Sequence, residues 1–194
     1  MTGFIAVLAT GILSLFSQRV QTSLVSFDYS FKVAADLPLT GKGSVEFEGE
    51  SFHMKGNGLE LWSDGESRWT FDSSSMELYI ETVDPSCVDY ISNPVALLRD
   101  ASTAFTQTGE KSTVFAGVKA VCVSLVPVDR KTGLGAVSIY FNSENIPVGA
   151  SVTVSDGTVT TFTFSSFAFK KPEGKKFACD EKSLGGDVLV TDLR

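Results

Sequence analysis

From Ser23 to the C-terminus, apolar and polar residues alternate in short runs that turn-forming residues separate. In the run SFDYSFKV at 26–33, alternate side chains are apolar and fall on one face of a strand: Phe27, Tyr29, Phe31 and Val33. The intervening segments, such as LTGKG, KGNG and DRKTGLG, carry turn chemistry. The Asp-Gly pairs at 64–65 and 156–157 favour tight hairpins. Strands separated so briefly must mostly be antiparallel neighbours, so the pattern predicts a long β-meander.

Two segments follow the helical repeat instead. Between about 11 and 22, polar residues form a stripe of Thr10, Ser14, Ser17 and Gln21, and apolar residues lie largely on the other side, at Ile12, Leu13, Leu15, Phe16 and Val20. In YISNPVALLRDASTAF, Asn93 is placed as an N-cap and Pro94 at the first helical position, with Val95, Leu98 and Ala101 at helical spacing. The expected order is a helix, about five strands, a helix, and five or six more strands.

The length and composition favour one domain over residues 1–194. The chain has 194 residues, 43% of them hydrophobic, which is enough for one full core and short for two. It contains no internal repeat, low-complexity tract or linker. The predicted fold class is α+β, mainly β: a large curved antiparallel sheet with two or three helices against a single face.

The N-terminal run GFIAVLATGILSLF is uncharged. It fits the apolar region of an export signal and is too short to span a membrane, although no Lys or Arg precedes it. Residues 1–10 are therefore open to interpretation as the end of an export signal, ahead of the amphipathic helix. No cysteine precedes Cys87, so the protein is not expected to carry an N-terminal lipid anchor itself.

The net charge of −7 argues against a nucleic-acid partner, which would call for clustered Lys and Arg. Four lysines between 170 and 176 are interrupted by Pro-Glu-Gly, and we interpret this segment as a solvated hairpin tip. The three cysteines lack the CxxC spacing of zinc and thioredoxin-type motifs. Cys122 lies in an apolar run and is expected to be buried, whereas pairing of Cys87 with Cys179 is left open.

Residues suited to catalysis are scarce. His53 is the only histidine, and its place between Phe52 and Met54 predicts a side chain that points away from the apolar face. No G-x-S-x-G motif or phosphate-binding glycine loop is present. We therefore expect no enzyme, no metal and no cofactor, and a hydrolase that uses His53 is the least favoured hypothesis.

One face of the predicted sheet collects many large apolar side chains. We predict that these side chains and two residues of the second helix, Leu97 and Leu98, form one apolar surface. Its strand residues are Phe27, Tyr29, Phe31, Phe47, Phe52, Met54, Leu61, Trp69, Phe71, Leu78, Ile80, Ile139, Phe141, Phe162 and Phe164. Two short helices can cover only part of such a face. The pattern leaves two interpretations open, a closed core and a concave apolar pocket that these residues line.

Residues 41–81, GKGSVEFEGESFHMKGNGLELWSDGESRWTFDSSSMELYIE, resemble the LolA-like family of periplasmic outer-membrane lipoprotein carriers. That family has a Gly-led strand, an F-x-M or F-x-W strand, then a D-G-x-x-x-W segment and a strand that ends in a bend. NPVALL is similar to its second helix, and IYFNSENIPVGASVTVSDGTVTTFTFSSF resembles its central hairpins. The terminal DVLVTDLR resembles the closing strand of Bacteroides-type members, and the likeness extends from about residue 11 to Arg194.

The resemblance implies an incomplete β-barrel with helices as a lid over its concave apolar face. Lipoprotein acyl chains would be held there after release from an inner-membrane exporter and then passed to an outer-membrane acceptor. It further implies a periplasmic protein, expected to be a monomer, that uses no cofactor. The alternative on the same scaffold is a lipid- or lipoprotein-sensing module of the cell envelope that transports nothing.

The resemblance departs from the family at the second strand. Proteobacterial carriers have an arginine there that holds the lid through hydrogen bonds to the first helix. This chain has Phe47 at that place, between Glu46 and Glu48. Closure of the lid by that arginine is therefore not implied.

Overall fold

The structure is a computed structural model that describes residues 11–35, 38–129 and 132–194. The predicted end of an export signal at 1–10 lies outside the described residues. The helices are α1 (Ile12–Gln21), α2 (Pro94–Arg99) and the 3₁₀ helix η2 (Glu181–Leu184). The strands are β1 (Leu24–Ala34), β2 (Leu39–Glu48), β3 (Ser51–Gly56), β4 (Leu59–Ser63), β5 (Ser67–Asp72), β6 (Glu77–Thr82), β7 (Phe105–Phe115), β8 (Val118–Pro127), β9 (Leu134–Phe141), β10 (Pro147–Val154), β11 (Val159–Lys170) and β12 (Leu189–Asp192).

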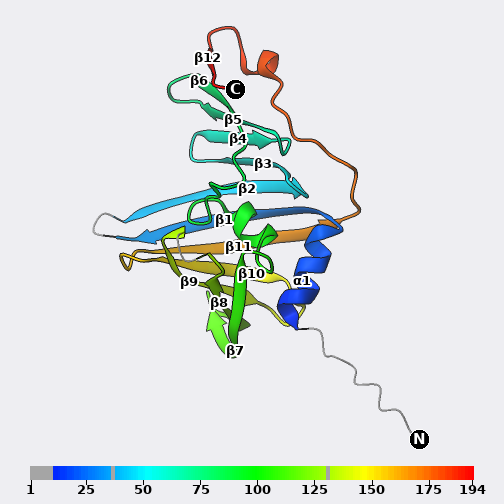
Figure 1. Ribbon diagram of the computed structural model, residues 1–194, viewed down its shortest axis with the longest axis vertical. Coiled ribbons are helices and arrows are strands. Elements are labelled where there is room, and N and C mark those ends of the chain that lie inside the picture. Colours follow the sequence, from blue (N-terminus) through cyan, green and yellow to red (C-terminus); the bar gives the residue numbers. More distant parts are fainter. Residues whose placement is uncertain (1–10, 36–37, 130–131) are drawn as a thin grey trace, which may run out of the picture.

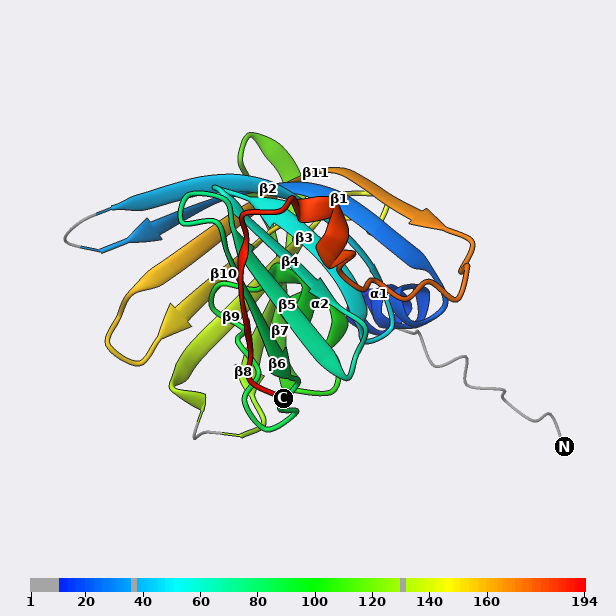
Figure 2. The same cartoon turned by 90° about the horizontal axis from the view of Figure 1, so that it is seen from above.

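The described strands form one twelve-stranded sheet in the order β12-β6-β5-β4-β3-β2-β1-β11-β10-β9-β8-β7. It consists of two meanders, β1 to β6 and β7 to β11, which meet where β1 pairs with β11. The sheet curves into an arch whose edge strands, β12 and β7, lie at opposite ends (Figures 1 and 2). The fold is therefore mainly β with an open, curved sheet, as predicted, and it is not a closed barrel.

The last strand corrects the expectation of a wholly antiparallel sheet. β11 already pairs with β1 on one side and β10 on the other, so the chain after it has no free neighbour at the centre of the sheet. It crosses to the far edge and enters β12 in the direction of β6, with Leu189 opposite Glu77. This pair is parallel and all other neighbouring strands are antiparallel, which makes the sheet mixed.

Both predicted α-helices are present and lie on the concave side of the sheet. α2 lies within the arch, and α1 lies beside the ends of β1 and β11 (Figure 2). The Asn93 side chain accepts hydrogen bonds from the N–H groups of Val95 and Ala96, at 2.9 and 3.3 Å. Asn93 is therefore the N-cap of α2, with Pro94 at the first helical position, as predicted.

α1 buries a different stripe from the one predicted. Leu13, Phe16 and Val20 are buried as expected, but Ser17 is buried with them and Leu15 is exposed. Residues three and four apart share one side of a helix, so the stripe that faces the sheet includes Ser17, one turn after Leu13. The prediction of Ser17 on the wet side and Leu15 on the apolar side is wrong.

Both Asp-Gly pairs form hairpin turns. Gly65 and Gly157 have φ values of 96° and 90°, in the left-handed region that glycine adopts without strain. The Asp64 carboxylate accepts the N–H of Ser67 at 2.8 Å, and the Asp156 carboxylate accepts the N–H of Thr158 at 2.8 Å. These contacts close the β4–β5 and β10–β11 hairpins.

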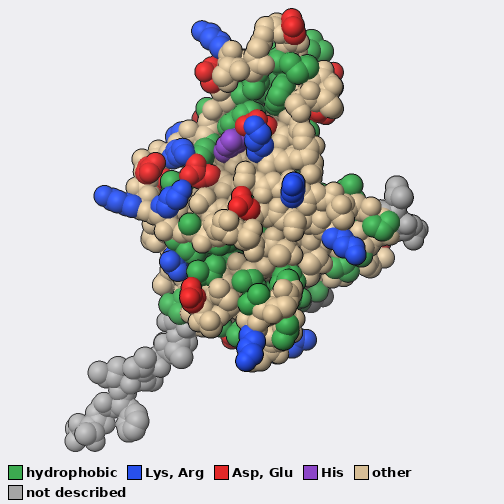
Figure 3. Space-filling model, turned by 180° about the vertical axis from the view of Figure 1, so that it is seen from behind, with side chains coloured by type: hydrophobic (Ala, Val, Ile, Leu, Met, Phe, Trp, Pro, Cys, Tyr) green, Lys and Arg blue, Asp and Glu red, His purple; other side chains and the backbone are tan. Residues whose placement is uncertain are grey.

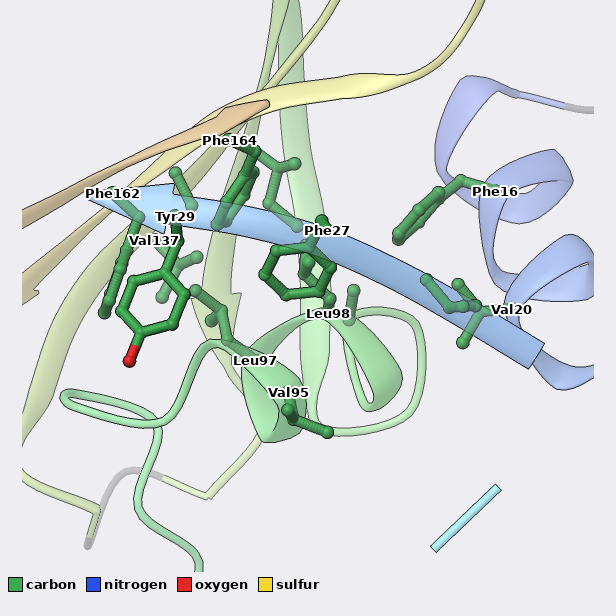
Figure 4. Close-up of a cluster of buried hydrophobic side chains, with 14 of the residues drawn as sticks. Phe16, Val20, Phe27, Tyr29, Val95, Leu97, Leu98, Val137, Phe162 and Phe164 are labelled. Carbon is green, nitrogen blue, oxygen red and sulfur yellow. The ribbon is translucent and has the colours of Figure 1, made fainter. Parts of the chain in front are cut away.

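Buried apolar side chains form two clusters on opposite faces of the sheet. The central cluster fills the concave face beneath α1 and α2 (Figure 4). The outer cluster consists of Trp69, Phe71, Leu78 and Ile80. Met54 pairs with Leu61 and Leu61 with Thr70, so the neighbours of Thr70 at 69 and 71 point to the convex face. The prediction of one continuous apolar face is therefore wrong for the four outer residues.

Residues 171–188, which we call the C-terminal strap, run from the end of β11 across the convex face to β12 (Figures 1 and 2). The strap places Cys179, Leu184 and Val188 against the outer cluster. The interpretation of its lysines as a hairpin tip is wrong, because Lys175 forms an ion pair with Glu46 on β2. The reason is again the central position of β11, which forces the chain to cross the sheet.

Candidate functional site

Most of the predicted lining residues lie on the concave face. The buried ones belong to the central cluster and are Phe27, Tyr29, Phe47, Phe52, Met54, Leu97, Leu98, Ile139, Phe141, Phe162 and Phe164. Phe31 and Leu61 are half-buried and pack against them. Figure 4 shows Leu97 and Leu98 pointing from α2 toward Phe27 and Tyr29 on β1. In this structure the helices fill the arch, so an apolar ligand would reach these side chains only by displacing a helix.

A β-bulge in β11 adds two rings to this face that alternation does not predict. Ser166 has a φ of 54°, and the pairing of β11 with β1 shifts at this point. Beyond it, Phe167 and Phe169 pack against the central cluster. The rings of Phe27 and Phe167 stack with centroids 5.0 Å apart and planes 2° apart. The sequence signal that could have indicated this bulge is the pair of serines that interrupts the alternation in FTFSSFAF.

Aromatic contacts hold α1 against the sheet. The Phe16 ring meets that of Phe141 edge to face at 5.3 Å, and that of Phe169 at 6.3 Å. The Arg19 guanidinium lies 4.0 Å from the centre of the Phe169 ring, in cation–π geometry. The contacts that hold α1 against these rings are therefore apolar or weakly directional.

A hollow of about 380 Å³ opens between α1 and the start of β7. Ser14, Ser17 and Gln21 line it from α1, and Phe105 and Gln107 line it from β7. The Ser17 hydroxyl is buried and has no hydrogen-bond partner among the described residues. A buried hydroxyl without a partner weakens the packing of α1 at this edge of the arch.

An ion-pair network fastens the C-terminal end of α2, and we call it the α2 latch. Arg99 donates to the Asp100 carboxylate through Nε and Nη2, at 2.7 and 2.8 Å. Its Nη1 lies 2.7 Å from Glu50 Oε2, in the turn between β2 and β3. The Tyr90 hydroxyl donates to Asp100 Oδ2 at 3.2 Å. The latch therefore ties α2 to the β2–β3 hairpin.

Within the latch, Arg99 stays protonated and Tyr90 stays neutral across the physiological pH range. Burial opposes the positive charge of Arg99, but Asp100 and Glu50 outweigh it, so the pKa of Arg99 is raised. Burial, together with the negative charge of Asp100, raises the pKa of Tyr90 to about 12. Phe47, which the resemblance leads us to expect at the place of the family arginine, is fully buried in the central cluster and takes no part in the latch.

The concave face continues beyond α2 as an exposed strip. Strand pairing places Leu61 beside Met54 of the central cluster and carries the same face across β5 and β6 to β12. Leu59, Tyr79 and Leu189 lie on this strip and are exposed. We call Leu59, Leu61, Tyr79 and Leu189 the apolar ledge. One side of the apolar ledge is exposed to solvent, and the other adjoins the edge of the central cluster.

His53 lies on the convex face, as predicted, and is the purple side chain in Figure 3. Its Nε2 lies 2.8 Å from Glu60 Oε1, while Lys55 Nζ lies 3.1 Å from Glu60 Oε2. The imidazole stacks on Trp62 with centroids 5.2 Å apart. Within the described ranges, no group of three His, Cys, Asp or Glu side chains is placed to hold a metal ion.

The three cysteines are free. Cys122 is buried, as predicted, and Cys87 is exposed. Cys179 packs beside the outer cluster, where burial raises the pKa of its thiol to about 11. It is therefore a protonated, weakly reactive thiol at neutral pH.

The sequence matches the family profile described as outer membrane lipoprotein carrier protein LolA over residues 52–180, more than half of the chain. The chain belongs to the LolA family. The matched part runs from β3 into the C-terminal strap and includes α2 and the bulged strand β11. Membership of the Bacteroides-type subgroup stays a prediction.

The chain is also similar to solved structures at low sequence identity. The chain is similar to a conserved protein from Thermus thermophilus, with a TM-score of 0.55 and 12% identity, covering 93% of this chain and 96% of that one. It also matches a LolA superfamily protein from Nitrosomonas europaea, with a TM-score of 0.46 and 12% identity, covering 90% of this chain and 99% of that one. No curated protein sequence matches the chain. None of the helices in the described part has the length and apolar composition needed to cross a membrane.

Proposed function

We propose that this LolA family member is a periplasmic carrier that shields lipoprotein acyl chains against its concave face and passes them toward the outer membrane. The observation that supports this most is the central cluster, a large aromatic and aliphatic sheet face that α1, with ten residues, and α2, with six, help to cover. Short helices with few contacts open at a lower free energy than the strands they cover. An inner-membrane exporter and an outer-membrane acceptor are the proposed partners.

The free energy of transfer indicates that the cargo comes from an apolar environment rather than from water. Each methylene group that leaves water contributes about 0.8 kcal/mol, so several whole acyl chains taken from water would exceed the affinity of any reversible complex. Transfer from a bilayer or an exporter is apolar on both sides, and its net free energy is small. Cargo can then be passed on without ATP hydrolysis by this protein, so we propose no catalytic step and no cofactor.

The apolar ledge is the proposed entry to the concave face. It is exposed and continuous with Met54 and Phe52 of the central cluster. From the ledge, the acyl chain would next contact α2. The α2 latch must then open before the acyl chain can bind beneath α2. Displacement of α1 and α2 then exposes the rings of the central cluster to the cargo.

Binding of a fluorescent acylated peptide to the purified protein tests the carrier function. The double variant Leu59→Glu, Leu61→Glu should bind the peptide at least about tenfold more weakly. The introduced carboxylates would have to be desolvated when an acyl chain lies on the ledge. Val128→Glu is the matched control, since Val128 is an exposed valine just beyond β8, and it should bind like the wild type. Thermal unfolding confirms that both variants fold.

Failure of the wild-type protein to take up the acylated peptide would contradict the proposal, above all if native mass spectrometry of protein from the periplasm gives only the mass of the bare chain. Depletion in cells separates the carrier from a lipoprotein-sensing module. Mislocalised lipoproteins favour the carrier, whereas an altered stress response with correctly placed lipoproteins favours the sensor. His53→Ala should retain binding, because His53 lies on the opposite face.

A further inference from the structure

The β7–β8 hairpin ends in an apolar tip, residues 114–118, with the sequence VFAGV. Val114 is 66% exposed and Val118 is 45% exposed, and Ala116 at the apex is exposed as well. Other hairpins of the chain turn through Asn57-Gly58, Asp64-Gly65 or Asp156-Gly157. Exposed turns normally carry polar residues, so this tip departs from the pattern of its own sheet.

The backbone of the tip has a conformation that favours a polar residue. Ala116 and Gly117 have φ values of 48° and 82°, which are those of a type I′ turn. The β3–β4 turn has nearly the same values, 54° and 82°, and uses Asn57 and Gly58, the pair that this turn prefers. Alanine is strained in the left-handed region, which asparagine tolerates. The tip therefore has an apolar residue at a turn position where asparagine is preferred.

Apolar side chains surround the tip. Val114 is paired with Lys119, and Phe115 with Val118, so the exposed valines point to opposite faces of the hairpin. The Phe115 ring stacks on Tyr140 at 4.1 Å, which supports the base of the tip on the sheet. A protein that docks on a hairpin covers one face, whereas acyl chains surround an inserted tip on every side.

The tip is also locally basic in a chain of net charge −7. Lys111 and Lys119 flank it, and no acidic residue occurs between Lys111 and Val128. Glu110 precedes this stretch on β7, and Glu144 lies in the turn between β9 and β10. Lys119 adjoins Val118, so its stem can lie along apolar neighbours while its ammonium group reaches a lipid phosphate.

We propose that the β7–β8 tip inserts into the surface of a phospholipid bilayer that contains anionic lipid. Val114, Ala116 and Val118 enter the boundary between headgroups and acyl chains, and Lys111 and Lys119 contact phosphates. So few apolar side chains give a weak, reversible attachment. The inference does not depend on what the concave face binds, because β7 lies at the edge of the sheet opposite the apolar ledge and β12.

Co-sedimentation of the full chain with vesicles of mixed phosphatidylethanolamine and phosphatidylglycerol tests this proposal. V114N/V118N should bind about tenfold more weakly than the wild type, because both inserted side chains become polar. Val128→Asn is the matched control, since Val128 is 63% exposed at the other end of the hairpin, and it should bind like the wild type. Lys119→Gln should weaken binding to these vesicles more than to pure phosphatidylcholine.

Ala116→Asn separates membrane binding from hairpin stability. Asparagine relieves the strain at the apex, so the midpoint of thermal unfolding should stay the same or rise, while vesicle binding should fall. A wild-type chain that stays in the supernatant with every vesicle would overturn the proposal. A V114N/V118N variant that sediments with vesicles like the wild type would also overturn it. So would tip variants that no longer bind a protein partner but still bind vesicles normally.

Discussion

At the scale of single residues, two glycines on β2 decide how the aromatic rings of the concave face pack. Tyr29 is paired with Gly43, and Phe31 with Gly41. A Cβ atom on Gly43 would lie 2.3 Å from the carbonyl oxygen of Lys55 and 2.7 Å from Tyr29 Oη. Both distances are far below van der Waals contact. LTGKG, predicted as a turn, is therefore part of a strand whose glycines make room for rings.

Gly43→Ala should destabilise the protein by about 1–3 kcal/mol, because the added methyl group overpacks this contact. Gly109→Ala on β7 is the matched control, since nothing lies within 4 Å of the Cβ atom it would add. It should change the free energy of unfolding by less than about 0.5 kcal/mol. Urea unfolding followed by tryptophan fluorescence measures both, and equal losses of stability would show that Gly43 has no special packing role.

At the scale of elements, α2 depends on its neighbours for its position. It has six residues, far fewer than the roughly 12–15 that an isolated helix needs in water. Asn93 caps its start, Leu97 and Leu98 bury its inner side, and Arg99 ties its end to Glu50. Loss of one of these contacts should loosen α2 without unfolding the sheet.

Glu50→Gln should change global stability by less than about 1 kcal/mol, because Glu50 is the largely exposed partner of the pair. It should still increase the opening of α2 up to about fivefold, as a loss of that size allows. Amide hydrogen exchange at Leu97 and Asp100, whose N–H groups bond within the helix, measures this opening. Glu144→Gln serves as the control, and equal exchange in both variants would exclude the latch.

At the scale of the whole molecule, the C-terminal strap joins the centre of the sheet to its far edge. The Glu48 carboxylate on β2 accepts the N–H groups of Glu173 and Gly174, at 3.0 and 2.7 Å. The hydrogen bond from Glu173 is the main cause that lowers the pKa of Glu48. A hydrogen bond from Lys175 is the main cause that lowers the pKa of Glu46. Both carboxylates therefore hold the strap in their charged form.

Acid should release the strap. A carboxyl group whose pKa is lower in the folded state stabilises that state fully above its unfolded pKa, about 4.3 for glutamate, and ceases to do so as the pH falls through the folded value. The protection of the amides at 173–175, taken relative to the intrinsic exchange rate at each pH, should therefore fall in acid before that of the central strands. Glu48→Gln should show raised exchange already at neutral pH and Glu144→Gln should not, and protection that stays the same in Glu48→Gln would refute this role.

Local sequence patterns predict most strands and both α-helices of this protein, and many of the side chains in its central cluster. Alternation predicts strands because successive side chains point to opposite faces, and the Asn93 cap and both Asp-Gly turns act within a few residues. These signals also assembled the apolar residues of β1, β3, β9 and β11 on one face. The family resemblance rests on the same local motifs.

Which face of each strand points inward, and what covers that face, depends on contacts between distant parts of the chain. A period of two says that Trp69 and Phe71 share a face but not which one, since a turn can exchange the two faces between strands. The bulge at Ser166, the parallel pairing of β12 and the latch between Arg99 and Glu50 join residues through space rather than along the chain. No local pattern encodes such contacts, because they form only when the whole sheet has curved around α1 and α2.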